Sequence, residues 1–78
     1  MTNPWISVYD SLPAETGWYP VLICWEPREG FFPDAAYWNG TEFLDESSSP
    51  RPYSHYINQP CDSFTEAEAL ADDNDPDW

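Results

Sequence analysis

The fold of this chain is decided by the stretch DAAYWNGTEFL, residues 34–44. Asn39 and Gly40 stand at its centre, between runs of aromatic and β-forming residues. Both residue types tolerate the positive φ that a type I′ turn needs at its two central positions. We therefore expect a β-hairpin with a two-residue loop, in which Trp38 faces Thr41. Because an isolated hairpin is marginal in water, further strands must pack against it.

Three other segments have the composition of strands. Residues 5–9, 21–25 and 53–57 are apolar or alternating runs of strand length, bounded by turn residues. Pro33 is expected to limit how far the first strand of the hairpin extends toward the N-terminus. Residues 45–52 are polar and contain two prolines, which predicts a loop.

A helix is expected near the C-terminus. Ser63 and Glu66 have the spacing of a capping box, and good helix formers follow over residues 65–71, enough for about two turns. The predicted fold is mainly β (α+β), with a small antiparallel sheet of four to five short strands and one short C-terminal helix. Residues 1–61 are assigned to the β part, and residues 62–78 to an acidic helix and tail of the same single domain.

The charge of the chain excludes several classes of function. Its 78 residues include fifteen Asp or Glu and two Lys or Arg, so that the net charge is −13. Direct nucleic-acid binding needs a basic patch, which two arginines do not provide. Anionic membranes would repel the chain, and no apolar run has the length of a spanning helix. The first residues lack the features of a signal peptide, so we expect a cytoplasmic location.

Catalysis and metal binding have little support in the sequence. Cytosolic thiols are normally reduced, and Cys24 lies in an apolar run that suits a buried thiol. A Cys24–Cys61 disulfide and a metal site of Cys24, Cys61 and His55 are the less favoured alternatives, since the spacing matches no zinc pattern. Ser54 and His55 are adjacent in a predicted strand and should point to opposite faces, so they are not expected to act as nucleophile and base. We expect no enzyme, no cofactor and a hydrogen-bonded structural role for His55.

Five segments together resemble the domain-of-unknown-function 551 family of phages, prophages and bacteria. They are WISV at 5–8, DSLP at 10–13, VLI at 21–23, AYW at 36–38 and SHYI at 54–57. The family pattern opens with W-I-S-V and L-P and closes with T-H-W-M-P-L-P. The likeness covers residues 5–60, but YINQP at 56–60 departs from the closing motif and the acidic tail is extra. The resemblance implies a compact β-rich domain of phage or prophage origin, and it transfers no catalytic residue.

The density of carboxylates in residues 62–78 suggests imitation of nucleic-acid phosphates. A full helix of this length would span about 25 Å, or one charge per roughly 3.6 Å, against about 3.4 Å per strand of duplex DNA. A fully extended chain would widen the spacing to around 8 Å. One hypothesis is therefore a phage-type inhibitor of a host protein with a basic groove, such as a CRISPR-Cas effector or a restriction complex. Its predicted binding carboxylates are Asp45, Glu46, Glu66, Glu68, Asp72, Asp73, Asp75 and Asp77.

A second hypothesis needs no mimicry. Exposed aromatic side chains among carboxylates can anchor a protein partner while the charges steer it. Trp18, Tyr19 and Tyr53 are the predicted anchors of such an adaptor, which would regulate another host protein, and Trp78 is a further candidate. A third hypothesis assigns the acidity to solubility alone.

Overall fold

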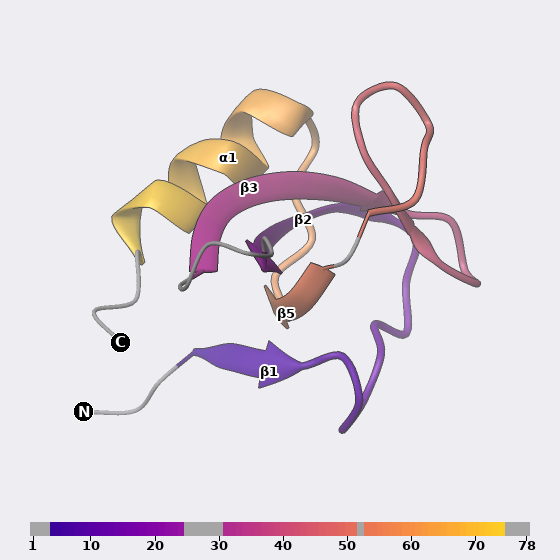
Figure 1. The fold of residues 1–78 in the computed structure, drawn as a ribbon. Coiled ribbons are helices and arrows are strands. Elements are labelled where there is room, and N and C mark those ends of the chain that lie inside the picture. Colours follow the sequence, from indigo (N-terminus) through magenta and orange to yellow (C-terminus); the bar gives the residue numbers. More distant parts are fainter. Residues whose placement is uncertain (1–3, 25–30, 52, 75–78) are drawn as a thin grey trace.

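The computed structural model describes residues 4–24, 31–51 and 53–74, and Figure 1 shows the arrangement of its elements. In chain order they are β1 (Trp5–Ser7), β2 (Gly17–Cys24), β3 (Phe31–Trp38), β4 (Phe43–Leu44), β5 (Tyr53–Ile57) and α1 (Phe64–Asp73). The strands form one antiparallel sheet in the order β1-β5-β2-β3-β4. The predicted fold class, a small antiparallel sheet with one short C-terminal helix, is confirmed.

The predicted hairpin joins β3 to β4, but its turn is wider than a type I′ turn. Trp38 pairs with Phe43, so four residues separate the strands. The Asn39 N–H group donates to the Glu42 carbonyl at 3.2 Å, and Asn39 Oδ1 accepts two backbone N–H groups of the turn at 2.8 and 2.9 Å. Gly40 has a φ of 99°, whereas Asn39 keeps a negative φ. The two-residue turn was a wrong prediction because the asparagine side chain closes the turn itself.

Strands β2 and β3 extend through prolines that were expected to end them. Pro20 pairs with Ala35 in the β2–β3 ladder, and Pro33 lies two positions away with the same orientation. The Ala35 N–H group points away from β2 and donates to Asp34 Oδ1 at 2.8 Å. Alternate pairs in an antiparallel ladder exchange no hydrogen bonds, and both prolines occupy such pairs. Their missing N–H groups therefore cost no bond, and Pro33 blunts the open edge of β3.

The two faces of the sheet have different covers. Residues alternate between faces along a strand, so Leu22 lies on one face while Val21 and Ile23 lie on the other. Helix α1 packs on the Leu22 face through Ala67 and Ala71, which are both fully buried. Figure 1 shows α1 along the outside of β3, and its contacts are with β3 and β2.

The opposite face carries an aromatic core. Its buried rings are Tyr19, Trp38, Phe43, Tyr53 and Tyr56. Instead of a helix, the segment of residues 8–16 between β1 and β2 crosses this face, and hydrogen bonds from its backbone and side chains hold it there. With only 78 residues available, large rings replace a long aliphatic core.

Candidate functional site

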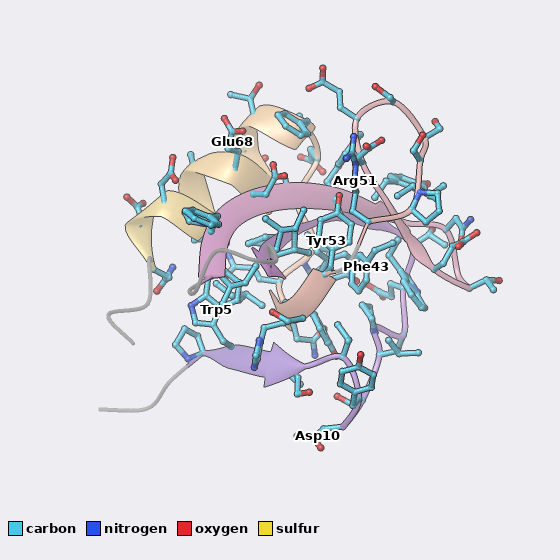
Figure 2. The ribbon with its side chains drawn as sticks, in the orientation of Figure 1. Trp5, Asp10, Phe43, Arg51, Tyr53 and Glu68 are labelled. Carbon is cyan, nitrogen blue, oxygen red and sulfur yellow. The ribbon has the colours of Figure 1, made fainter. Side chains whose placement is uncertain are left out.

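The acidic residues of the described chain gather most densely on α1. Glu66, Asp72 and Asp73 are exposed and Glu68 is half-buried, while the buried side of the helix carries alanines. Figure 2 shows Glu68 on α1, well apart from Phe43, Tyr53 and Arg51. The predicted carboxylates at residues 66–73 are therefore brought together on a solvent-facing surface, and Asp75 and Asp77 lie outside the described residues.

These carboxylates form two rows along the helix. Successive helical residues rotate by about 100°, so Glu66 and Asp73 project within about 20° of each other. By the same rule Glu68 and Asp72 lie within about 40° of each other, on the other side of the exposed Ala69. From Glu66 to Asp73 the helix rises about 10 Å, which gives one charge per roughly 3.5 Å of axis. We call this surface, Glu66, Glu68, Asp72 and Asp73, the acidic face of α1.

Three of the four charges on the acidic face, Glu68, Asp72 and Asp73, lower the stability of the helix. No basic residue stands in the last turn, where a positive charge would complement the helix dipole. Asp72 and Asp73 stand there instead, and each costs roughly 0.3–1 kcal/mol relative to a favourable charge. Glu68 and Asp72 form a like-charge pair four residues apart, which costs a further 0.2–0.5 kcal/mol or so. The helix is held by its buried alanines and by its caps, to which Glu66 contributes, and not by Glu68, Asp72 and Asp73.

Glu66 differs from the other three because it also caps the helix. Its N–H group donates to Ser63 Oγ at 3.2 Å, as the capping-box prediction requires. Its carboxylate accepts the Asp62 N–H group at 3.4 Å rather than the Ser63 N–H group. The helix extends two residues beyond the predicted end at residue 71. The Trp5 indole N–H group donates to the Asn74 carbonyl at 2.8 Å and ties this end to β1.

Asp45 is committed to its own loop, which corrects its predicted role as a binding carboxylate. Its Oδ1 accepts the N–H groups of Ser47 and Ser49 at 2.8 and 2.9 Å, and its Oδ2 accepts from Arg51 Nε at 2.7 Å. The Arg51 hydrogen bond, with help from these backbone groups, lowers the pKa of Asp45. Glu46 beside it is exposed. Asp45 therefore orders the loop, and only its neighbour is presented to solvent.

The three predicted aromatic anchors pack inside the protein. Tyr19 is 1% exposed, and its hydroxyl donates to the Glu15 carbonyl at 2.8 Å. Trp18 is half-buried between Tyr37 and Phe64, with ring centroids 5.4 and 5.6 Å away. Tyr53 is 7% exposed. Tyr19 and Tyr53 thus belong to the core, whereas Trp18 keeps part of its surface exposed. The contact of these rings with a partner stays a prediction, and Trp78 lies outside the described residues.

An open groove on the aromatic face was not anticipated from the sequence. It has a volume of about 250 Å³ and lies between residues 8–12, the β3–β4 turn and residues 50–51. Trp38, Phe43 and Tyr53 contribute to its lining. Tyr9 and Leu12 also line it and are 92% and 51% exposed. The available signal was two large apolar residues around a turn; Tyr9 had been assigned to a strand that in fact ends at Ser7.

Ser54 and His55 contact each other, contrary to the prediction that they point to opposite faces. Their Oγ and Nδ1 atoms are 2.9 Å apart. The β2–β5 register shifts between Leu22 and Ile23, so that β5 carries an extra residue at this point. Such a bulge breaks the strict alternation of side chains. Ser54 Oγ also donates to the Leu22 carbonyl at 3.4 Å, and burial lowers the pKa of His55. The expected hydrogen-bonded role of His55 is confirmed.

The two cysteines lie near opposite ends of β2: Cys24 within the strand, and Cys61 beside Trp18. Cys61 is a buried free thiol that pairs with Trp18 through an isolated bridge, whereas Cys24 is the last residue of the strand. Six residues of strand separate these positions by about 20 Å, which rules out both the disulfide and a shared metal site. Burial raises the pKa of the Cys61 thiol. The Cys24 side chain lies outside the described part of the structure, so its predicted burial stays a prediction.

Within the described residues no group of three or more His, Cys, Asp or Glu side chains is placed to hold a metal ion. Over the same ranges, no helix is long and apolar enough to cross a membrane. Comparisons of the chain with family models, with curated proteins and with solved structures find no match. The acidic face of α1 and the aromatic groove are therefore the two candidate sites, judged on their geometry.

Proposed function

We propose that this protein is a small acidic inhibitor that binds a host nucleic-acid-handling defence complex and blocks its nucleic-acid site. The proposed target is a CRISPR-Cas effector or a restriction complex with a basic groove. Binding occurs through the acidic face of α1, whose carboxylates take the place of phosphates. The proposed activity is binding without catalysis, and it requires no cofactor.

One observation carries the proposal: the carboxylates of α1, taken over both rows, have an average axial interval close to that of the phosphates in one DNA strand. The helix gives roughly 3.5 Å of axis per charge, against about 3.4 Å in the duplex. Glu68, Asp72 and Asp73 lower the stability of the helix that bears them, and the helix has no cation to offset them. Solubility alone would be served equally well by acids placed near the N-terminus of the helix, where the dipole favours them.

The biological setting of the proposal comes from the sequence. The resemblance of residues 5–60 to a phage and prophage family favours an origin in which inhibiting host defence is useful. Action in the host cytoplasm follows from such a target. The resemblance supplies this context and no residue-level role.

The proposal is tested with purified effector complexes loaded with guide RNA. Binding of labelled target duplex is measured with increasing amounts of this protein, for a panel of effector types and for a restriction enzyme. Inhibition of at least one member is expected, and it should weaken as salt rises, because counterion-dependent contacts are lost. A panel in which no member is inhibited would contradict the proposal.

A matched pair of variants then locates the contact. Glu68→Gln, Asp72→Asn and Asp73→Asn together remove three charges from the acidic face while sparing the cap at Glu66. A control variant with amides at Asp10, Glu15 and Glu46 has the same net charge but leaves α1 intact. The first variant should lose inhibition and the second should retain most of it. Equal inhibition by both would show that only net charge matters, and mimicry by α1 would be abandoned.

The adaptor hypothesis remains as the second candidate, with different anchors. Trp18, Tyr19 and Tyr53 are packed in the protein, but Tyr9 is 92% exposed beside a groove. An adaptor would bind its partner equally well with nucleic acid present, whereas a mimic would be displaced. The duplex competition above separates the two.

A further inference from the structure

The groove on the aromatic face is lined by buried core rings at its base and by exposed apolar side chains at its side. Trp38, Phe43 and Tyr53 in its lining are 4–7% exposed and belong to the buried core. Tyr9 and Leu12 are the most exposed large apolar side chains in the described part of the chain. Single exposed apolar side chains are normal on protein surfaces, but two of them beside an apolar hollow form a contiguous patch of the kind that marks a contact site.

A buried hydroxyl lies beneath the lining of the groove. The Tyr53 hydroxyl has no hydrogen-bond partner among the described residues, and the residue is 7% exposed. Burial and the negative charges of Asp34 and Asp45 raise the pKa of Tyr53, so the hydroxyl keeps its proton. Figure 2 shows Tyr53 next to Arg51 and Phe43. Because the hydroxyl oxygen is itself buried from solvent, it belongs to the floor beneath the groove and is not presented to an occupant.

The size and charge of the groove indicate the kind of occupant. Its volume of about 250 Å³ is below the range of about 300–1,000 Å³ that is usual for small-molecule and cofactor sites. It suits one or two side chains of a protein segment. Glu42 lies in its lining, and the Arg51 guanidinium is engaged by Asp45 at 2.7 Å. With a net charge of −13, the protein attracts a segment that carries positive charge.

We propose that this groove is a docking site for a basic segment of a partner protein, which inserts one large apolar side chain beside Tyr9 and Leu12. Lysine or arginine residues flank that side chain and face Glu42. The inference shares with the proposed function only the basic character of the partner, since α1 lies on the other face of the sheet.

The test uses the full chain, labelled with nitrogen-15, and a capped synthetic peptide with a central leucine flanked by two lysines on each side. Amide shifts of Tyr9, Leu12 and Glu42 should move and saturate. A peptide with alanine at the centre should bind about tenfold more weakly, because the buried side chain is lost. Equal binding of the two peptides, or shifts confined to α1, would show attraction by charge alone and overturn the docking site.

Variants of the protein provide matched controls. Tyr9→Ala should weaken the leucine peptide by about tenfold without changing the fold, because this side chain is 92% exposed. Tyr37→Ala removes another exposed aromatic, which packs against Trp18 and lies outside the groove, and should leave binding unchanged. Equal effects of Tyr9→Ala and Tyr37→Ala would overturn the assignment.

Two further measurements separate this inference from the proposed function. The amide variant at Glu68, Asp72 and Asp73 should still bind the leucine peptide in the groove. This result is expected even if that variant and the control variant inhibit the effector equally. Dilution of the protein without peptide should leave the groove amides unshifted. Concentration-dependent shifts there would identify a second copy of the chain as the occupant and overturn the basic segment.

Discussion

Replacing Tyr53 by phenylalanine should make the free protein more stable. The hydroxyl is buried without a partner, while the ring packs against Phe43 with centroids 6.2 Å apart and belongs to the aromatic core. The substitution keeps the ring and deletes only the unsatisfied group. A buried polar group without a hydrogen bond costs about 1–3 kcal/mol, so we expect a gain of about 1 kcal/mol. For a domain of this size that raises Tm by about 4–8 °C.

Tyr19 provides a control with the same chemical change and the opposite expected sign. Its ring is also buried, but its hydroxyl donates to the Glu15 carbonyl at 2.8 Å. Tyr19→Phe removes that bond and should destabilise the protein by about 1 kcal/mol. Both variants are compared with the parent by calorimetry and by urea unfolding at pH 7. If Tyr53→Phe is destabilising to the same extent as Tyr19→Phe, the Tyr53 hydroxyl has a partner in solution and the reasoning is refuted.

Three other substitutions test the local structure. Asn39→Pro should destabilise by several kcal/mol, since it removes the N–H bond to Glu42 and the side-chain acceptor of the turn; a cooperative urea transition with an unchanged midpoint would contradict the turn described. Asp45→Asn should lower Tm at neutral pH. Because the folded pKa of Asp45 lies below its ordinary value of 3.8, its contribution is present above that value and is lost as the pH falls through the folded pKa, so the Tm difference should vanish in acid. Asp73→Lys should stabilise α1 by about 0.3–1 kcal/mol through the helix dipole while weakening effector inhibition; higher Tm with full inhibition would separate this residue from the proposed contact.

Local chemistry made several features predictable. The Ser63 cap acts over three residues, so the helix start follows from the sequence. The turn at Asn39 and Gly40 was located correctly because these residues have few other uses between two β-forming runs. The length of the turn was predicted wrongly. Two-residue and four-residue turns have similar local energies, and the contact between Trp38 and Phe43 selects the longer one. The register shift of two residues kept Phe43 on the expected face, because side chains alternate with a period of two.

Part of the candidate sites could likewise be predicted from local sequence, and part depended on packing. The charges of α1 could be placed from sequence, since an exposed helical face follows from the pattern of buried alanines. The fate of each aromatic residue could not, because Tyr9 and Tyr19 have the same side chain and differ only in what surrounds them. One lies beyond the end of β1 and is exposed, and the other lies in the central strand β2 and is buried.

The sequence by itself thus determined the approximate positions of the strands, the turn and the helix, though not their ends, and how strongly the protein is charged. These features depend on neighbouring residues and on composition. Only the tertiary structure decided which rings form the core, where β5 bulges at Ser54, how Asp45 is engaged and which hydroxyl is left without a partner. These features depend on contacts between residues far apart in the chain. Burial there is worth more than any local preference, so packing overrides the pattern of the sequence.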